Sequence, residues 1–206
     1  MAAKTKESKK IRDLIRIGVF SALWIAVSWI IACTIGFFPP ILMALPCILS
    51  IAGALILVVM LSKVNIRGGI LISSFLFGLC LFSMVPYGLL FICIFAGGII
   101  GEIIYNAAGK NSSAGKMVGI TFPMIGLALG EYIPLCYMQD AFRSFYADKF
   151  TSPVGDAAME IINTPLVIVL VVGTIICSVL GCLWGKKIVA KRMTNQGGQS
   201  NGKNTK

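Results

Sequence analysis

Residues 17–62 read IGVFSALWIAVSWIIACTIGFFPPILMALPCILSIAGALILVVMLS, and none of these 46 residues carries a charge. A membrane-spanning helix needs about 20 apolar residues, so this stretch is long enough for two spans. The GFFPP segment at 36–40 divides it, because a glycine and paired prolines do not continue a helix. The stretch therefore predicts two consecutive transmembrane helices.

The rest of the chain repeats this pattern. The 34 residues between Arg67 and Glu102 are also uncharged, and MVPYG at 84–88 interrupts them. Two further apolar stretches follow, and the third helix has the least sharply marked limits. We expect an all-α integral membrane protein with six transmembrane helices, at about 14–35, 41–62, 69–84, 88–108, 117–138 and 165–185.

The composition excludes several classes of protein. Hydrophobic residues make up 57% of the 206 and charged residues only 13%, whereas a soluble domain carries about 25% charged residues. The chain has no histidine, which excludes His-ligated zinc, haem with a proximal histidine, and Ser–His or Cys–His nucleophile pairs. We expect a membrane protein that is not an enzyme and has no cofactor.

The distribution of basic residues predicts the orientation. The net charge is +10, and 16 of the 18 lysines and arginines lie in the two terminal segments and the connections after the second and fourth helices, leaving Arg143 and Lys149. By the positive-inside rule both termini are cytoplasmic. The excess of positive charge then faces anionic lipid, so no nucleic-acid partner is expected. We divide the chain into a basic amino-terminal segment (1–13), a six-helix membrane domain (14–185) and a basic, largely disordered tail (186–206).

Two sets of residues that could have carried chemistry do not have the required spacing. The loop GKNSSAGKM at 109–117 is one residue too long for a phosphate-binding P-loop, and Met117 stands where a Mg²⁺-binding hydroxyl is needed. The seven cysteines show no CxxC spacing and lie in or beside the predicted spans. We expect them to pack as small apolar residues and to hold no metal.

Glu102 and Glu131 are the acidic residues expected well inside spans. A carboxylate in hydrocarbon is costly and usually faces a cavity, a partner or water. Glu131 falls in the outer half of the fifth helix, where ligand contact and a structural hydrogen bond are both open. Glu102 falls near the cytoplasmic end of the fourth helix, where a structural or interface role is favoured.

The long external segment, residues 139–164, mixes aromatic residues with charges of both signs. Loops of this length are usually functional or disordered. It is either a lid over a ligand or a segment in which Asp140 and Arg143, three residues apart, simply pair with each other.

Gly18, Ala22 and Ala26 are spaced four residues apart, so they form a stripe along the first helix. Small residues let membrane helices approach closely. The stripe could meet a partner helix, but the glycine pairs 97/101, 126/130 and 181/185 have the same spacing, and most of these must serve internal packing.

Several segments together resemble a known family. They are IRDLIRIGVFSAL at 11–23, GFFPP at 36–40, EYIPL at 131–135 followed by MQDA at 138–141, and LG at 180–181 leading to GKK at 185–187. Over about residues 10–192 the chain resembles the Trep_Strep (MptD-type) family of substrate-binding S components of energy-coupling factor (ECF) transporters.

This resemblance implies a role and a set of residues. Such proteins capture a micronutrient from outside, in a bacterial cytoplasmic membrane, and associate with a membrane T component and two cytoplasmic ATPases that power uptake. The resemblance places Gly18, Ala22 and Ala26 at the surface that meets the T component. It implies a substrate-binding set near the outer helix ends, namely Glu131, Tyr132, Gln139, Asp140 and Arg143.

Two other classes of function fit the sequence less well. An intramembrane enzyme would need clustered aspartates, or paired glutamates with a histidine, and neither pattern is present. A stand-alone secondary carrier or channel is the alternative, although no internal repeat with matching interrupted helices is visible.

Overall fold

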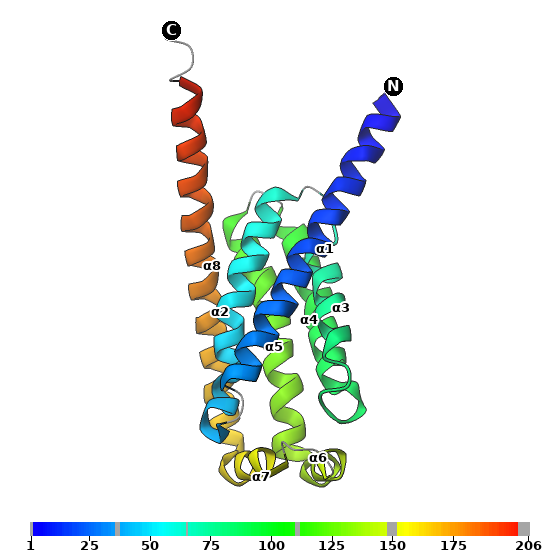
Figure 1. The fold of residues 1–206 in the computed structure, drawn as a ribbon, viewed down its shortest axis with the longest axis vertical. Coiled ribbons are helices and arrows are strands. Elements are labelled where there is room, and N and C mark those ends of the chain that lie inside the picture. The colour runs from blue at the N-terminus through cyan, green and yellow to red at the C-terminus, as the bar shows by residue number, and fades with distance from the viewer. Residues whose placement is uncertain (1, 36–37, 65, 110–111, 148–151, 202–206) are drawn as a thin grey trace.

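The computed structural model describes residues 2–35, 38–64, 66–109, 112–147 and 152–201. Six helices run up and down in one bundle (Figure 1): α1 (Ala2–Ile35), α2 (Pro39–Lys63), α3 (Gly69–Cys80), α4 (Leu89–Ala108), α5 (Ser113–Tyr137) and α8 (Thr164–Asn201). Two short helices, α6 (Gln139–Tyr146) and α7 (Ser152–Ile161), lie across the end opposite the start of α1 and the end of α8. We call the end with α6 and α7 the outer end and the other the inner end.

The prediction of an all-α membrane protein is confirmed. Within the described ranges, five helices are long and apolar enough to cross a membrane. The sixth, α3, has only 12 residues, about 18 Å at the usual helical rise.

The third helix was predicted to reach residue 84, and it is shorter. The residue before a proline avoids helical backbone, and Val85, which precedes Pro86, is extended with φ −135° and ψ 157°. Tyr87 and Gly88 then adopt positive φ angles of 57° and 62°. The chain thus crosses the outer end of the bundle through a turn and a single 3₁₀ turn, η1 (Pro86–Gly88).

The two terminal helices are longer than predicted. Most of the segment 1–13 belongs to α1, and α8 continues through most of the segment 186–206, which the sequence predicts to be largely disordered; residues 202–206 lie outside the described residues. Helix growth from an existing span needs no new nucleus, and the added segments contain alanine and lysine, which favour helix.

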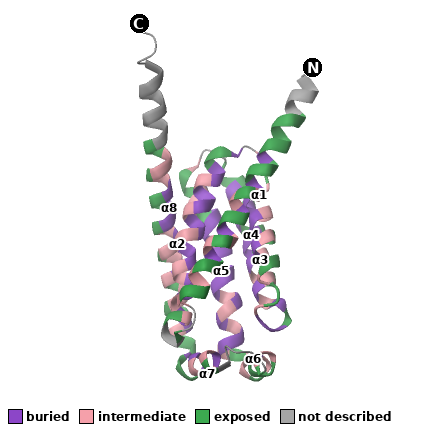
Figure 2. Ribbon diagram, viewed as in Figure 1, coloured by how far each residue is buried: buried purple, intermediate pink, exposed green. Residues whose placement is uncertain are grey.

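The central helix is α5, and α1 and α8 lie at the periphery. In its most apolar stretch 67% of the α5 residues are buried, against 22% for α1 and 28% for α8. Figure 2 shows buried residues spread through the interior of the bundle and exposed ones along much of α1.

Glycines bring the helices of the bundle close together. A Cβ atom at Gly101 would lie 2.2 Å from the Gly119 carbonyl oxygen, and one at Gly126 would lie 2.2 Å from the Cys93 carbonyl oxygen. The glycine pairs 97/101 and 126/130 therefore serve the α4–α5 contact, and the pair 181/185 serves the α2–α8 contact in the same way.

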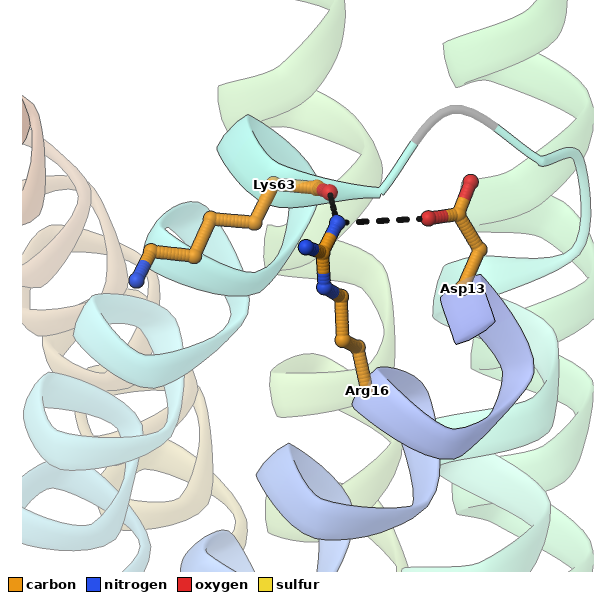
Figure 3. Close-up of polar contacts among 3 residues, drawn as sticks. All are labelled: Asp13, Arg16 and Lys63. Carbon is orange, nitrogen blue, oxygen red and sulfur yellow. Dashed lines mark hydrogen bonds and ion pairs between the residues drawn. The ribbon is translucent and has the colours of Figure 1, made fainter. Parts of the chain in front are cut away.

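At the inner end, Arg16 joins α1 to α2 (Figure 3). Its Nη1 donates a 2.9 Å hydrogen bond to the Lys63 carbonyl and lies 3.4 Å from the Asp13 carboxylate. Lys63 ends α2, where the last carbonyls have no partner within the helix. The guanidinium satisfies one of them and fixes the position of α1.

Candidate ligand-binding cavity

A cavity of about 500 Å³ lies at the outer end of the bundle. Its walls come from the outer parts of α1, α2, α3, α4 and α5 and the connection after α3, and α6 and α7 also contribute. The residues that line it are Ser28, Trp29, Ala32, Cys33, Leu42, Leu45, Leu49, Phe77, Leu81, Ser83, Met84, Val85, Leu90, Leu127, Glu131, Leu135, Phe142, Tyr146, Val154 and Gly155.

An aromatic stack supports the wall on the side of α1 and α3. The rings of Phe77 and Trp24 are 4.0 Å apart and nearly parallel, with an angle of 6° between their planes. Phe77 lines the cavity, whereas Trp24 is wholly buried behind it. Gly53 on α2 makes room for this indole, since a Cβ atom there would lie 2.6 Å from Trp24 Nε1. The stack holds Phe77 in one orientation.

The outer side of the cavity is formed by α6 and α7. Phe142 and Tyr146 stack with their centroids 4.6 Å apart, and a Cβ atom at Gly155 of α7 would lie 3.1 Å from the Phe142 ring. The Tyr146 hydroxyl donates to the Met84 carbonyl. Burial, and secondarily the carboxylate of Glu131, raises the pKa of Tyr146 to about 12, so this phenol remains a neutral donor at physiological pH.

The ion pair in the external segment differs from the one considered from the sequence. Arg143 Nε lies 3.3 Å from the carboxylate of Asp156 on α7. It pairs with Asp156 and not with Asp140, because α7 folds back alongside α6. The pair therefore links the two helices that cover the cavity, and both side chains are half-exposed.

Glu131 is the one predicted substrate-binding residue that lines the cavity. Its Oε1 is buried and has no hydrogen-bond partner among the described residues. Ser28, from α1, also lines the cavity, and its buried hydroxyl is likewise unpartnered within the part of the chain that the structure describes. Two polar groups in this wall are thus available to a ligand.

The other four predicted residues lie outside the lining. Tyr132 is wholly buried and donates a 2.6 Å hydrogen bond to the Met43 carbonyl, which joins α5 to α2. Gln139 donates to the Met159 carbonyl at 3.3 Å and so joins α6 to α7. Asp140 is exposed, and Arg143 makes the ion pair with Asp156.

Most residues of the cavity wall carry no distinguishing signal in the sequence. Trp29 and Phe77 line it, yet in sequence they resemble any apolar residue of a membrane helix. Phe142 and Tyr146 belong to the segment noted for its aromatic residues, which was the available signal.

Glu102 has a different environment. Its Oε1 accepts hydrogen bonds from the Gly68 amide at 2.7 Å and the Asn106 side chain at 2.8 Å, and its Oε2 accepts from the Ile70 amide at 3.1 Å. Gly68 and Ile70 lie at the start of α3, where amides lack helical partners. Glu102 therefore caps α3, in agreement with the structural role favoured for it.

The small residues of α1 are on its outward side. A Cβ atom at Gly18 would meet nothing within 4 Å, and Ala22 and Ala26 are exposed. Their neighbours Val19 and Leu23 are 63% and 48% exposed. Unlike the glycine pairs of α4, α5 and α8, this stripe has no helix of the same chain against it in the described structure.

Comparison with known proteins identifies the family. A family model described as a hypothetical bacterial integral membrane protein (Trep_Strep) matches residues 11–194. Searches of curated proteins and of solved structures found no match. The match covers nearly the whole chain and agrees with the several apolar helices of the bundle, so this multi-pass membrane protein belongs to the Trep_Strep family of bacterial integral membrane proteins.

Proposed function

We propose that this chain is the substrate-binding S component of an ECF-type transporter in a bacterial cytoplasmic membrane. It captures a small molecule from outside and catalyses no reaction itself. A membrane T component and two cytoplasmic ATPases supply the energy for uptake.

The observation that carries the proposal is the cavity at the outer end. Its volume of about 500 Å³ lies within the range of about 300–1,000 Å³ found for small-molecule sites. The positive-inside rule places the opposite, basic end of the bundle in the cytoplasm, so the cavity is at the external side. A receptor that captures a solute from outside requires this arrangement.

The outward stripe of α1 supports the partner part of the proposal. Gly18, Ala22 and Ala26 are the residues that the family resemblance assigns to the T-component surface, and all three lie where a second protein could reach them. Close approach of two membrane helices depends on such small residues.

Co-purification from native membranes tests the proposal. A tagged chain is extracted in mild detergent after chemical crosslinking in the membrane, and the bound proteins are identified by mass spectrometry. The test variant carries Ala22→Leu and Ala26→Leu. The matched control carries Ala96→Leu, which adds the same side chain at an exposed site on α4.

We expect a T component and two ATPases with the wild type and the control, and their loss with the α1 double variant. Recovery of the chain alone after crosslinking would contradict the proposal. Solute transport by the purified chain in proteoliposomes without ATP would identify a stand-alone carrier instead.

A further inference from the structure

The cavity wall is rich in aromatic rings. Trp29, Phe77, Phe142 and Tyr146 all line it, and they come from three different helices. Phe77 is held by its stack on Trp24, and Tyr146 by its hydrogen bond to Met84. Aromatic faces attract the flat faces of other rings and also cations, through the negative face of the ring.

Two buried polar groups of the wall can accept hydrogen bonds from a ligand. Glu131 Oε1 and Ser28 Oγ are buried without partners within the described residues. No lysine or arginine is among the described residues that line the cavity. Phosphates and carboxylates are bound best by cationic or N–H donors, and this wall presents the carboxyl group of Glu131 instead.

A metal ion does not fit this wall either. Within the described ranges, the structure contains no group of three or more His, Cys, Asp or Glu side chains that could hold a metal ion. A sugar would need many hydrogen-bonding groups, whereas leucine and other apolar side chains make up most of this lining.

We propose that the outer cavity binds a ring-bearing organic cation, with its ring among the aromatic side chains and its positively charged nitrogen at Glu131. The geometry of the wall carries this inference. Its meaning for uptake rests on the function proposed above. A carboxyl group with a buried, unpartnered oxygen and aromatic rings each favour a cation, so the two features select the same ligand class.

The charge of the external segment agrees with this ligand class. Residues 139–164 contain four acidic and two basic residues. A net negative surface around an entrance raises the local concentration of cations and their rate of association. The inner end is strongly basic and would repel the same ligand.

Binding of three matched probes tests the proposal. Tryptamine, tryptophol and indole-3-acetate share one ring system, and at pH 7 they are a cation, a neutral alcohol and an anion. Their affinities are measured by isothermal titration calorimetry on the full chain in a maltoside detergent, which carries no cationic group that could occupy the cavity.

We expect tryptamine to bind at least tenfold more tightly than tryptophol and indole-3-acetate not to bind detectably. Glu131→Gln should abolish the preference of the amine over the alcohol. The control Glu160→Gln removes an exposed acid of α7 that lies outside the lining, and it should keep the preference.

The ranking on the wild-type chain tests the ligand class without any variant. Equal affinity for the amine and the alcohol, preference for the acid, or no binding of any probe would overturn the proposal. Its failure is separable from that of the transporter role. If the ATPases co-purify but the chain prefers indole-3-acetate, only the proposed ligand class is overturned. If the chain prefers tryptamine but no partner co-purifies, only the transporter role is overturned.

Discussion

Glu102 and Glu131 are both glutamates inside apolar helices, yet their hydrogen-bonding environments differ because they lie at opposite ends of the bundle. At the inner end, three N–H donors from the start of α3 and from Asn106 surround the Glu102 carboxylate. At the outer end, Glu131 Oε1 is buried without a partner among the described residues and beside a cavity.

The difference separates a structural carboxylate from one that is available to a ligand. A buried charge is tolerated when hydrogen bonds replace its hydration, and Glu102 receives them from its own chain. Glu131 lacks them on one oxygen, so a group that enters the cavity can supply a partner. The inner end should therefore control stability and the outer end should control binding.

Glu102→Ala should have the largest effect on stability. It leaves the Gly68 and Ile70 amides without their acceptor, and unsatisfied buried groups cost about 1–3 kcal/mol each. We expect the free energy of unfolding to fall by about 3 kcal/mol, measured by titration with a denaturing detergent in mixed micelles. A loss below about 0.5 kcal/mol would mean that water replaces the carboxylate and that the inner end is not closed.

Gly101→Ala should come next. Its Cβ atom would lie 2.2 Å from the Gly119 carbonyl oxygen, so α4 and α5 must separate, and overpacking of this kind costs about 1–3 kcal/mol. Gly18→Ala is the control, because a Cβ atom there meets nothing within 4 Å. In the same unfolding titration, equal losses for the two variants would contradict the assignment of α1 to the outside of the bundle.

Tyr132→Phe should lower stability by about 1 kcal/mol, the usual worth of one hydrogen bond. The hydroxyl joins α5 to the Met43 carbonyl of α2 and is not part of the cavity lining. Probe binding should therefore be unchanged. Loss of binding without loss of stability would restore Tyr132 as a ligand-contacting residue.

Glu131→Gln should have the smallest effect on stability. The amide keeps the shape of the side chain, and Oε1 has no hydrogen-bond partner among the described residues that the change could remove. We expect a change within about 0.5 kcal/mol, or a slight gain, in the unfolding titration. A large loss would show that Glu131 is structural like Glu102, and the contrast between the two ends would not hold.

The external segment shows what a local sequence pattern can predict and what it cannot. The segment was predicted to be either a lid over a ligand or a stretch in which Asp140 and Arg143 pair with each other, and α6 does supply Phe142 and Tyr146 to the cavity. The spacing of Asp140 and Arg143 suggested a local ion pair, but Arg143 pairs with Asp156. Sequence neighbours compete with residues that the fold brings near, and the fold decides between them.

The number and order of the helices followed from the sequence itself. Uncharged stretches such as residues 17–62, and breaks such as 36–40 and 84–88, are local features. They act locally because a chain in hydrocarbon must satisfy its own backbone hydrogen bonds, and a helix does so within one segment. The same reasoning predicted a short and uncertain third helix, although not that it would end at Cys80.

The tertiary structure alone decided which apolar residues face the cavity and which carboxylate lacks a partner. Lipid is as apolar as a protein core, so hydropathy cannot distinguish Phe77 in the cavity wall from Leu79, which is 53% exposed on the same helix. Glu102 and Glu131 are likewise indistinguishable in the sequence, because both are glutamates within apolar stretches. Their roles differ because the amides of Gly68 and Ile70, more than 30 residues away along the chain, reach one of them and not the other.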